Sequence, residues 1–418
     1  MPDHKVLPLS FAQQQFWLAD QLDPGNPSYN CAGYLDLSGP IDAELLRAAA
    51  TRTLEDNDVA RVRFMERDGV IRQLVGDLGA AAVSLVDLSA ERDSTSAAHT
   101  RMTAVAKQAI DLHAGPPVTC HVLRVADDRV LLSLCAHHIV VDGYGFVLVL
   151  RRMAEVYTAL TEERPVPAVG HGQLADVVAE DAAYRASPAW QAHREFWTAR
   201  AADHPPVRTL AAGWAPVAHC SVRSALEVPP AAVDGLRAVA RTGRCGFSGV
   251  LIAAAARYTQ QATGERDVVL GLAVTGRQGR VVRDVPGLMA NVVPLRVRTD
   301  PAVPLAECAA EVAREARAAL AHQRYDGLFA DLQQHRVFGP VVNVLPWSRP
   351  LLFGQVAAVP EYLSTGPQDD ICLTFSPQPP GGGIRLIVEA NPTTYDADAV
   401  NEHLHGLAAL LTPPSCSD

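Results

Sequence analysis

The sequence lacks the features of a membrane-spanning or secreted protein. No run of about 18 consecutive apolar residues occurs, and a run of that length is what predicts a membrane-spanning helix. The opening residues, from Met1 to Lys5, do not combine a basic segment with an apolar run, as a signal peptide does. We therefore expect a soluble protein with no membrane partner.

Closely spaced cysteines are also lacking. The eight cysteines are scattered along 418 residues, and no two are spaced as Cys-x-x-Cys. A chain of this length forms a sizeable core without disulfides or a structural metal. The pattern is typical of reduced core thiols in a cytosolic protein, so we expect a cytoplasmic location.

Basic residues are too few to suggest a surface for nucleic acid. Lys and Arg number 36 against 46 Asp and Glu, which gives a net charge of −10, and no long basic run is present. Nucleic-acid backbones are bound by clustered positive charge, so nucleic acid is not expected as a partner. The hydrophobic content of 48% excludes a disordered chain, and the length suggests two or three domains.

Hydrophobic patterning predicts helices and strands that mix in both halves of the chain. The predicted helices are 11–21, 42–54, 146–160, 190–201, 230–241, 248–263, 305–323 and 397–411, and the predicted strands are 32–37, 117–125, 130–135, 268–274, 292–297, 341–345 and 384–389. This mixture is typical of an α/β or α+β fold. A stretch with proline and glycine at 163–171 is the best candidate for a boundary, and it divides the chain into lobes 1–168 and 169–418.

The densest polar cluster in an apolar context runs from His137 to Gly145. It reads His-His-Ile-Val-Val-Asp-Gly-Tyr-Gly and lies between a predicted buried strand and a strongly periodic helix, which is a usual place for catalytic groups. If the strand continues through both histidines, their side chains point to opposite faces, so one can face a cavity while the other packs. Asp142 can orient an imidazole or pair with a distant arginine, and the glycines allow substrate to approach the backbone.

From the residues alone, other interpretations of this cluster stay open. The two histidines can be hydrogen-bonded residues at the end of a strand, with glycines that serve only the turn. A metal site is less favoured, because the cluster has no helical pair of histidines four residues apart and no second cluster completes a ligand set. A serine hydrolase is disfavoured because the sequence contains no Gly-x-Ser-x-Gly.

The His-His-x-x-x-Asp-Gly sequence at 137–143 resembles the signature of the condensation domains of nonribosomal peptide synthetases, which belong to the chloramphenicol-acetyltransferase-like superfamily. Further segments resemble the motifs of this family in the same order and over nearly the whole chain. They are Leu9–Trp17 with Leu22–Pro24, Asp58–Phe64, Tyr184 with Phe196 and Trp197, Gly271–Arg277 with Asn291–Arg296, His322 with Gln323, and Gly339–Trp347. The second motif departs from the family, because Glu55–Asn57 replaces its usual His-Glu.

This resemblance implies a V-shaped pseudo-dimer of two acetyltransferase-like lobes, with the histidine loop and the active site at their interface. It implies that His138 takes part in the reaction, with His137 beside it, and that Gly143 offers its backbone N–H near the reacting carbonyl. A histidine with a pKa of about 6.5 is able to accept or relay a proton near neutral pH.

The resemblance assigns weaker or structural roles to other residues. Asp142 would form an ion pair with Arg277 and so hold the histidine loop. The residues that it places along the substrate tunnel are Asn343, Tyr144 and Trp17. Of these, Trp17 is more simply explained as a core residue.

The implied activity is the transfer of an acyl or aminoacyl group from the phosphopantetheine thioester of a peptidyl or aryl carrier protein to an amine, which forms an amide bond. No bound cofactor is expected, because the substrates arrive on the phosphopantetheine of the carrier protein. Two other functions stay open, namely ester formation on a hydroxyl acceptor and a non-catalytic module that recruits partners. The acceptor is either free or bound to a carrier.

Motifs like those of the family fill the chain from Leu9 to Trp347. We therefore expect a free-standing, monomeric enzyme that meets its carrier protein in trans. Carrier proteins of this pathway type are usually acidic, so docking on a chain with a net charge of −10 has to be local. Arg277, Arg280 and Arg283 are candidates for that docking surface, although ordinary solvated arginines, with Arg277 internal, fit the same pattern.

Overall fold

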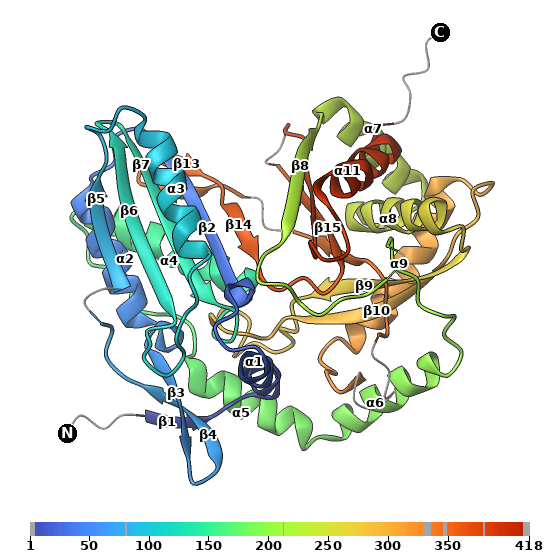
Figure 1. Cartoon of the computed structure of the whole chain (residues 1–418), viewed down its shortest axis with the longest axis horizontal. Helices are drawn as coiled ribbons and strands as arrows, with labels where there is room; N and C mark the ends of the chain where they lie inside the picture. The colour runs from blue at the N-terminus through green and yellow to red at the C-terminus, as the bar shows by residue number, and fades with distance from the viewer. Residues whose placement is uncertain are drawn as a thin grey trace. The chain divides into compact units, whose positions relative to one another are not determined.

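The structure is a computed structural model that describes residues 5–79, 82–211, 213–328, 336–345, 349–378 and 381–412. The chain forms two compact units. The first comprises Met1–Ala186, Arg277–Ala290 and Pro350–Pro367, and the second comprises Ser187–Gly276, Asn291–Arg349 and Gln368–Asp418. Helices and strands mix in both units (Figure 1), so the predicted α/β fold class is confirmed.

The units depart from the predicted boundary between residues 168 and 169. Helix α5 (Leu174–Arg185) stays with the first unit, where Asp181 accepts a hydrogen bond from the backbone N–H of Phe11 at 3.0 Å. The later segments 277–290 and 350–367 also belong to the first unit. The proline and glycine of the loop at 163–171 indicate one boundary along the chain. They cannot indicate that the chain returns twice to the first unit later in the sequence.

The first unit is built on a five-stranded sheet of order β14-β2-β7-β6-β5. Its strands are β2 (Asn30–Ser38), β5 (Val83–Asp87), β6 (Val118–Ala126), β7 (Arg129–His137) and β14 (Glu361–Thr365). Strands β6 and β7 form the predicted antiparallel hairpin, and β2 lies on the other side of β7. The strand that ends at His137 is therefore the central one.

Both faces of this sheet are buried. Since side chains alternate along a strand, Val130 and Leu132 of β7 pack in the core with α2 (Ala43–Asp56) and α4 (Gly143–Thr161), whereas Leu131 packs with α3 (Ser94–Ala106). Figure 1 shows α3 lying across one face of the sheet. The end of β7 is thus fixed by packing from both sides.

Smaller elements complete the first unit. A three-stranded sheet contains β1 (Lys5–Pro8), β3 (Val62–Arg67) and β4 (Val70–Val75) in the order β1-β4-β3, and β12 (Leu351–Phe353) pairs with β13 (Val356–Ala358). Two short 3₁₀ helices span Pro27–Tyr29 and Asp58–Ala60.

Helix α1 (Phe11–Leu22) begins where the sequence predicted. The Ser10 hydroxyl accepts a hydrogen bond from the Gln13 backbone N–H, and the Gln13 side chain accepts one from the Ser10 N–H. This reciprocal cap satisfies two backbone donors at the start of the helix. It also turns the side chain of Gln13 inward, toward the start of the helix.

The second unit is built on a six-stranded sheet of order β10-β9-β11-β15-β16-β8. Its strands are β8 (Val222–Val228), β9 (Asp267–Val274), β10 (Asn291–Arg298), β11 (Val341–Val344), β15 (Ile371–Pro377) and β16 (Ile384–Ala390), and its helices are α6 (Pro188–Ala201), α7 (Pro230–Thr242), α8 (Phe247–Thr263), α9 (Leu305–Ala321) and α11 (Ala397–Leu411). Leu251 of α8 packs in one core with Leu270 of β9 and Leu373 of β15.

All the helices and strands predicted from the sequence are present, with ends that differ by a few residues. The elements that the prediction missed are α3, α5, β1, β3, β4, β5, β8, β12, β13, β14 and β15. In the part of the chain that the structure describes, no helix combines the length and apolar character needed to cross a membrane. No disulfide joins the cysteines of that same part.

Candidate active site

The predicted histidine cluster lies where β7 ends and α4 begins. His137 is the last residue of β7 and pairs with Asn30 of β2, and Asp142 is the N-cap of α4. The three residues between His138 and Asp142 are apolar and almost completely buried. Their burial anchors the loop in the core, so the polar residues at both ends of it are held in place.

His137 is buried, with 1% of its surface exposed. Its Nδ1 accepts a hydrogen bond from the Ile139 N–H at 3.1 Å, and its ring stacks on Tyr29 with 5.9 Å between centroids. Burial lowers the pKa of His137 to about 3, and the neighbouring His138 adds to this effect. His137 is therefore neutral, and these contacts favour a structural role over the predicted catalytic one.

The low pKa of His137 predicts that acid destabilises the protein. The unfolded chain binds a proton at this residue below an ordinary pKa of about 6.5, whereas the folded chain does so only near the lowered pKa of about 3. Between these values the unfolded state binds more protons, so the free energy of unfolding falls as pH falls, by up to about 1.4 kcal/mol per pH unit. Denaturant unfolding of the wild type should show a lower free energy of unfolding at about pH 5.5 than at about pH 7.5. For His137→Leu, this decrease should be about 1 kcal/mol smaller than for the wild type.

His405→Leu is the matched control for this measurement, because His405 is exposed on α11. It should show the same pH dependence as the wild type. Equal pH dependence in the wild type and in His137→Leu would mean that His137 is protonated in the folded protein, which contradicts the prediction.

His138 is only partly buried, unlike His137. Its backbone N–H donates to the Tyr29 carbonyl at 2.8 Å, and its Nδ1 is buried without a hydrogen bond to any other residue that the structure describes. Burial lowers the pKa of His138, and the negative charge of Asp142 opposes this shift. The imidazole is therefore neutral near pH 7, and Nε2 is the nitrogen left to meet a substrate.

Asp142 is completely buried, and both of its carboxylate oxygens are hydrogen-bonded. Oδ1 accepts from the Gly145 N–H at 2.7 Å, which caps α4. Oδ2 accepts from Arg277 Nη1 at 2.6 Å and from the backbone N–H groups of Met289 and Ala290, each at 2.9 Å. Burial alone raises the pKa of Asp142, but Arg277 and the backbone donors outweigh it and hold that pKa below its ordinary value.

The ion pair that the resemblance implied between Asp142 and Arg277 is thus present. The Arg277 side chain is 2% exposed, and its Nη2 donates to the Gly287 carbonyl at 3.1 Å. The guanidinium also lies 5.0 Å from the centroid of the Tyr144 ring, an arrangement that stabilises a cation. This contact gives Tyr144 a part in holding Arg277, beside the tunnel role predicted for it.

Gly143 is the first residue of α4 and is partly exposed. A Cβ atom built on this glycine would meet no atom within 4 Å, so the space beside its backbone is open. Its N–H donates to no partner among the residues described. Because the N-terminus of a helix carries partial positive charge, this donor suits a developing oxyanion.

Two buried glutamines beside the histidine loop were not predicted as site residues. Gln13 of α1 is 2% exposed, and its Nε2 donates to the Ile139 carbonyl at 3.3 Å and to Gln73 Oε1 at 3.0 Å. Gln73 of β4 is fully buried and donates in turn to Gln13 and to the Pro8 carbonyl. The only sequence signal is a glutamine among apolar residues of a helix, because its partner lies 60 positions away.

The remaining tunnel candidates lie in different units. Trp17 is buried in the core of the first unit, with ring centroids 5.9 Å from Phe64 and 5.2 Å from His113, so it packs as a core residue. Asn343 is on β11 of the second unit, opposite Thr374 of β15, and is partly exposed.

The predicted residues that the first unit brings together are His137, His138, Asp142, Gly143, Tyr144 and Arg277. Pro346 and Trp347, from the last family-like segment, lie outside the described residues.

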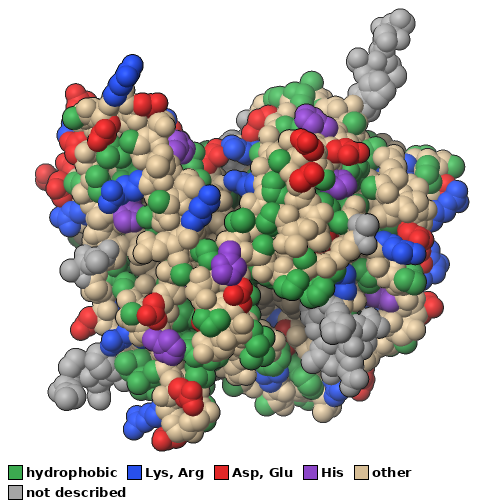
Figure 2. Space-filling view, in the orientation of Figure 1, with side chains coloured by type: hydrophobic (Ala, Val, Ile, Leu, Met, Phe, Trp, Pro, Cys, Tyr) green, Lys and Arg blue, Asp and Glu red, His purple; other side chains and the backbone are tan. Residues whose placement is uncertain are grey.

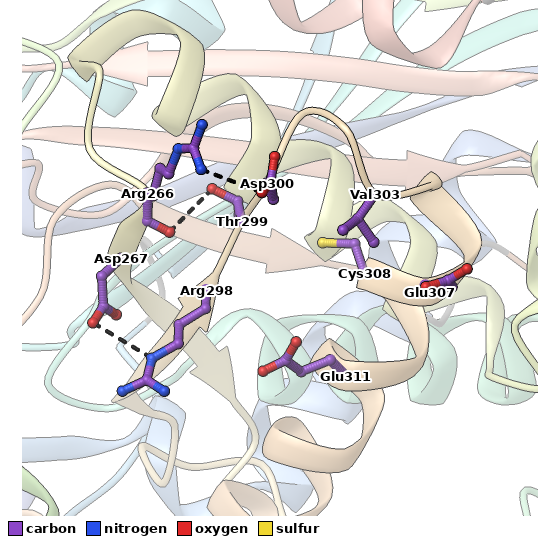
Figure 3. Close-up of a pocket in the computed structure, with 9 residues that line it drawn as sticks. All are labelled: Arg266, Asp267, Arg298, Thr299, Asp300, Val303, Glu307, Cys308 and Glu311. Carbon is purple, nitrogen blue, oxygen red and sulfur yellow. Dashed lines mark hydrogen bonds and ion pairs between the residues drawn. The ribbon is translucent and has the colours of Figure 1, made fainter.

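A cavity of about 520 Å³ lies in the second unit and is lined mainly by charged side chains (Figure 3). Within its wall, Arg266 pairs with Asp300 at 3.2 Å and Arg298 with Asp267 at 3.7 Å. These two pairs leave the charges of Glu307 and Glu311 in the lining, and the cavity contains no residue of the histidine loop. Among the described residues, no group of three or more His, Cys, Asp or Glu side chains is arranged to hold a metal ion.

Comparison with known proteins relates this geometry to a family. The sequence matches the family model of the condensation domain over residues 3–406. It is 37% identical over 411 residues to an isonitrile lipopeptide synthase of Streptomyces coeruleorubidus, which covers 97% of this chain and 28% of that protein. It is 32% identical over 426 residues to a dimodular nonribosomal peptide synthase of Bacillus subtilis (strain 168), which covers 100% of this chain and 18% of that protein. The chain therefore spans less than a third of the length of these two relatives.

Solved structures of condensation domains have the same fold. The first condensation domain of the calcium-dependent antibiotic synthetase, in complex with a substrate analogue, has a TM-score of 0.91 at 30% identity and covers 99% of this chain and 97% of that chain. A doubly mutated starter condensation domain of rhizomide synthetase, in complex with C8-CoA and Leu-SNAC, has a TM-score of 0.90 at 31% identity and covers 99% and 96%.

The two α/β units and the His-His-x-x-x-Asp-Gly loop define a protein of the chloramphenicol-acetyltransferase-like class. Within that class, this chain belongs to the condensation domain family of nonribosomal peptide synthetases.

Proposed function

We propose that this chain forms an amide bond by transferring an acyl or aminoacyl group from a carrier-bound phosphopantetheine thioester to an amine. The main support is the neutral imidazole of His138, which has Nε2 left for substrate at the end of β7. The open N–H of Gly143 follows in the same loop. Membership of the condensation domain family agrees with this chemistry.

In this reaction the amine nitrogen attacks the thioester carbonyl carbon, so a C–N bond forms and the C–S bond breaks. The nitrogen loses one proton and the departing sulfur gains one, and no further reactant is needed. A neutral imidazole accepts the amine proton or holds the amine in place by a hydrogen bond. Holding the two reactants together contributes separately, since ordered reactants reach effective molarities of about 10⁵ M or more.

Gly143 and Asp142 have different parts in this proposal. Attack on the carbonyl creates negative charge on its oxygen, which the Gly143 N–H at the start of α4 is suited to stabilise. Asp142 has no such contact to offer, because Arg277 and three backbone N–H groups occupy its carboxylate. Its part is to fix the segment 277–290 to the start of α4.

The proposed donor is an acyl group on the phosphopantetheine of a carrier protein, and the proposed acceptor is an amine, free or carrier-bound. The rhizomide synthetase domain was solved with C8-CoA and Leu-SNAC. We propose the same two chemical classes for this chain, a fatty-acyl or related thioester as donor and an amino-acid derivative as acceptor.

The test is to incubate the protein with octanoyl-loaded carrier protein and matched amines and alcohols, and to measure the intact mass of the carrier and the masses of the products. We expect the carrier to lose the octanoyl mass and an amide to appear with amines. If products form only with alcohols, the chain forms esters and the proposal of amide formation is wrong. An unchanged acyl-carrier with every acceptor would contradict catalysis and favour a recruiting module.

We propose that Arg280 and Arg283 of the segment 277–290, which also carries the exposed Asp284, contact an acidic carrier protein. Arg280 and Arg283 are exposed, and no ion pair holds either of them among the residues described. Val282 between them is buried against Val177 of α5 and Val285, which anchors the segment. Positive and negative side chains are interspersed over the face shown in Figure 2, so attraction of an acidic partner has to be local.

We expect Arg280→Glu combined with Arg283→Glu to raise KM for acyl-carrier protein by about 10-fold, because like charges repel at the rim of an interface. KM for octanoyl-CoA, which lacks the carrier protein, should stay within about twofold of the wild type. The matched control is Arg92→Glu with Arg101→Glu, two exposed arginines at α3 and its preceding turn. Equal KM values for acyl-carrier in the wild type and in the first variant would exclude this docking surface.

A further inference from the structure

We infer that Phe16 is a positioning residue for His138, and that helix α1 sets the plane of the imidazole by packing. The inference rests on the proposed reaction of His138. No other described residue hydrogen-bonds with His138 Nδ1. Reacting histidines are usually oriented by a hydrogen bond to the nitrogen that does not react. Packing by neighbouring residues can supply this orientation in His138.

Phe16 supplies the flat surface for this packing. Its ring stacks on the His138 imidazole with 5.0 Å between centroids and an interplanar angle of 24°. The Phe16 ring is held in turn by Tyr29, which it meets edge-on at 6.0 Å. Tyr29 also accepts the hydrogen bond from the His138 backbone N–H. The backbone and the ring of His138 are therefore fixed by two residues that contact each other.

Gln13 ties the same helix to the backbone of the histidine loop. It precedes Phe16 by about one helical turn, so both side chains lie on one side of α1. Its Nε2 donates to the Ile139 carbonyl, and its Oε1 accepts from Ser10 and from Gln73. With the amide of Gln13 fixed on three sides, α1 cannot slide along the loop without breaking buried hydrogen bonds.

Gly366 lies against the edge of the His138 ring. A Cβ atom on this residue would lie 2.5 Å from Cδ2 and 3.1 Å from Nε2 of His138, and its φ of +107° also favours glycine. The imidazole thus has Phe16 along its face and the backbone of Gly366 near its Cδ2–Nε2 edge. These contacts restrict rotation of the ring about χ2.

The test compares Phe16→Leu with Phe16→Tyr. Leucine keeps an apolar side chain but lacks the flat ring, so we expect kcat to fall by about 10- to 100-fold while KM for donor and acceptor changes little. Tyrosine keeps the ring, so Phe16→Tyr should retain most of the wild-type kcat. Both variants should melt within a few degrees of the wild type. Leu18→Ala, at an exposed position of the same helix, is the control and should match the wild type.

A double-mutant cycle separates failure of this inference from failure of the proposed function. If Phe16 acts through His138, Phe16→Leu should have no further effect in a His138→Ala background. Equal kcat in the wild type and Phe16→Leu, or equal effects of Phe16→Leu in both backgrounds, would overturn the positioning role while leaving the reaction in place. An inactive wild type would instead reject the proposed function.

Discussion

Replacing His138 with alanine is expected to lower kcat for amide formation by about 10²- to 10⁴-fold, which is the usual contribution of a positioned acid–base group. The protein should stay folded, because the His138 side chain is partly exposed and no other described residue hydrogen-bonds with its Nδ1. The measurement is steady-state amide formation, together with the melting temperature of the variant.

His99→Ala is the control for this variant. His99 lies on α3 of the same unit and contacts Tyr34, and it is not part of the histidine loop. Replacing it should therefore change the rate of amide formation by less than about twofold. Wild-type turnover by His138→Ala would reject the role of His138 in the reaction. A large drop in melting temperature would show instead that His138 is mainly structural.

The second large effect is expected for Asp142→Ala, which should lower the free energy of unfolding by about 3–5 kcal/mol and reduce activity with it. The substitution leaves the charge of Arg277 buried without its partner, because that side chain is only 2% exposed. It also leaves the backbone N–H groups of Gly145, Met289 and Ala290 without their acceptor. Denaturant unfolding measures the loss directly.

Asp36→Ala provides the matched control, since Asp36 forms a two-hydrogen-bond pair with Arg129 on the same sheet. That pair is about one-third exposed, so breaking it should cost about 1 kcal/mol or less. Similar losses of stability for Asp142→Ala and Asp36→Ala would contradict the account of Asp142 as the buried anchor of the loop.

The sequence predicted those parts of the fold that depend on local patterns. The apolar periodicity of α4 and the apolar runs of β6 and β7 were sufficient to place the histidine cluster between a buried strand and a helix. The pairing of Asp142 with Arg277 came from the family resemblance, because 135 residues separate the two positions. No local pattern connects residues that far apart.

Other parts of the site depend on long-range contacts and were missed for that reason. Strand β14 has a short, partly exposed sequence, and its pairing with β2 is visible only in three dimensions. The same is true of Gly366, which lies against His138, and of Gln73, which lies against Gln13.

Helix α1 shows how tertiary contacts override a prediction made from one helix. From the sequence, Leu18 is expected on the apolar side of this helix with Phe11 and Trp17, but it is 55% exposed. The inward face is set by the histidine loop, which takes Gln13 as a hydrogen-bond donor and Phe16 as a packing surface. Hydrophobicity alone ranks a leucine above a glutamine for burial, so it cannot identify this face.

The most direct test of the central claim is a single-turnover measurement of intact carrier mass. Octanoyl-loaded carrier protein is mixed with an equimolar amount of the wild type or of His138→Ala, with leucyl-N-acetylcysteamine thioester as the amine. We predict that the wild type removes the octanoyl mass from the carrier and forms octanoyl-leucyl amide, and that the His138→Ala sample keeps its acyl-carrier over the same time. An acyl-carrier that is unchanged with the wild type, or lost equally with both proteins, would contradict the account.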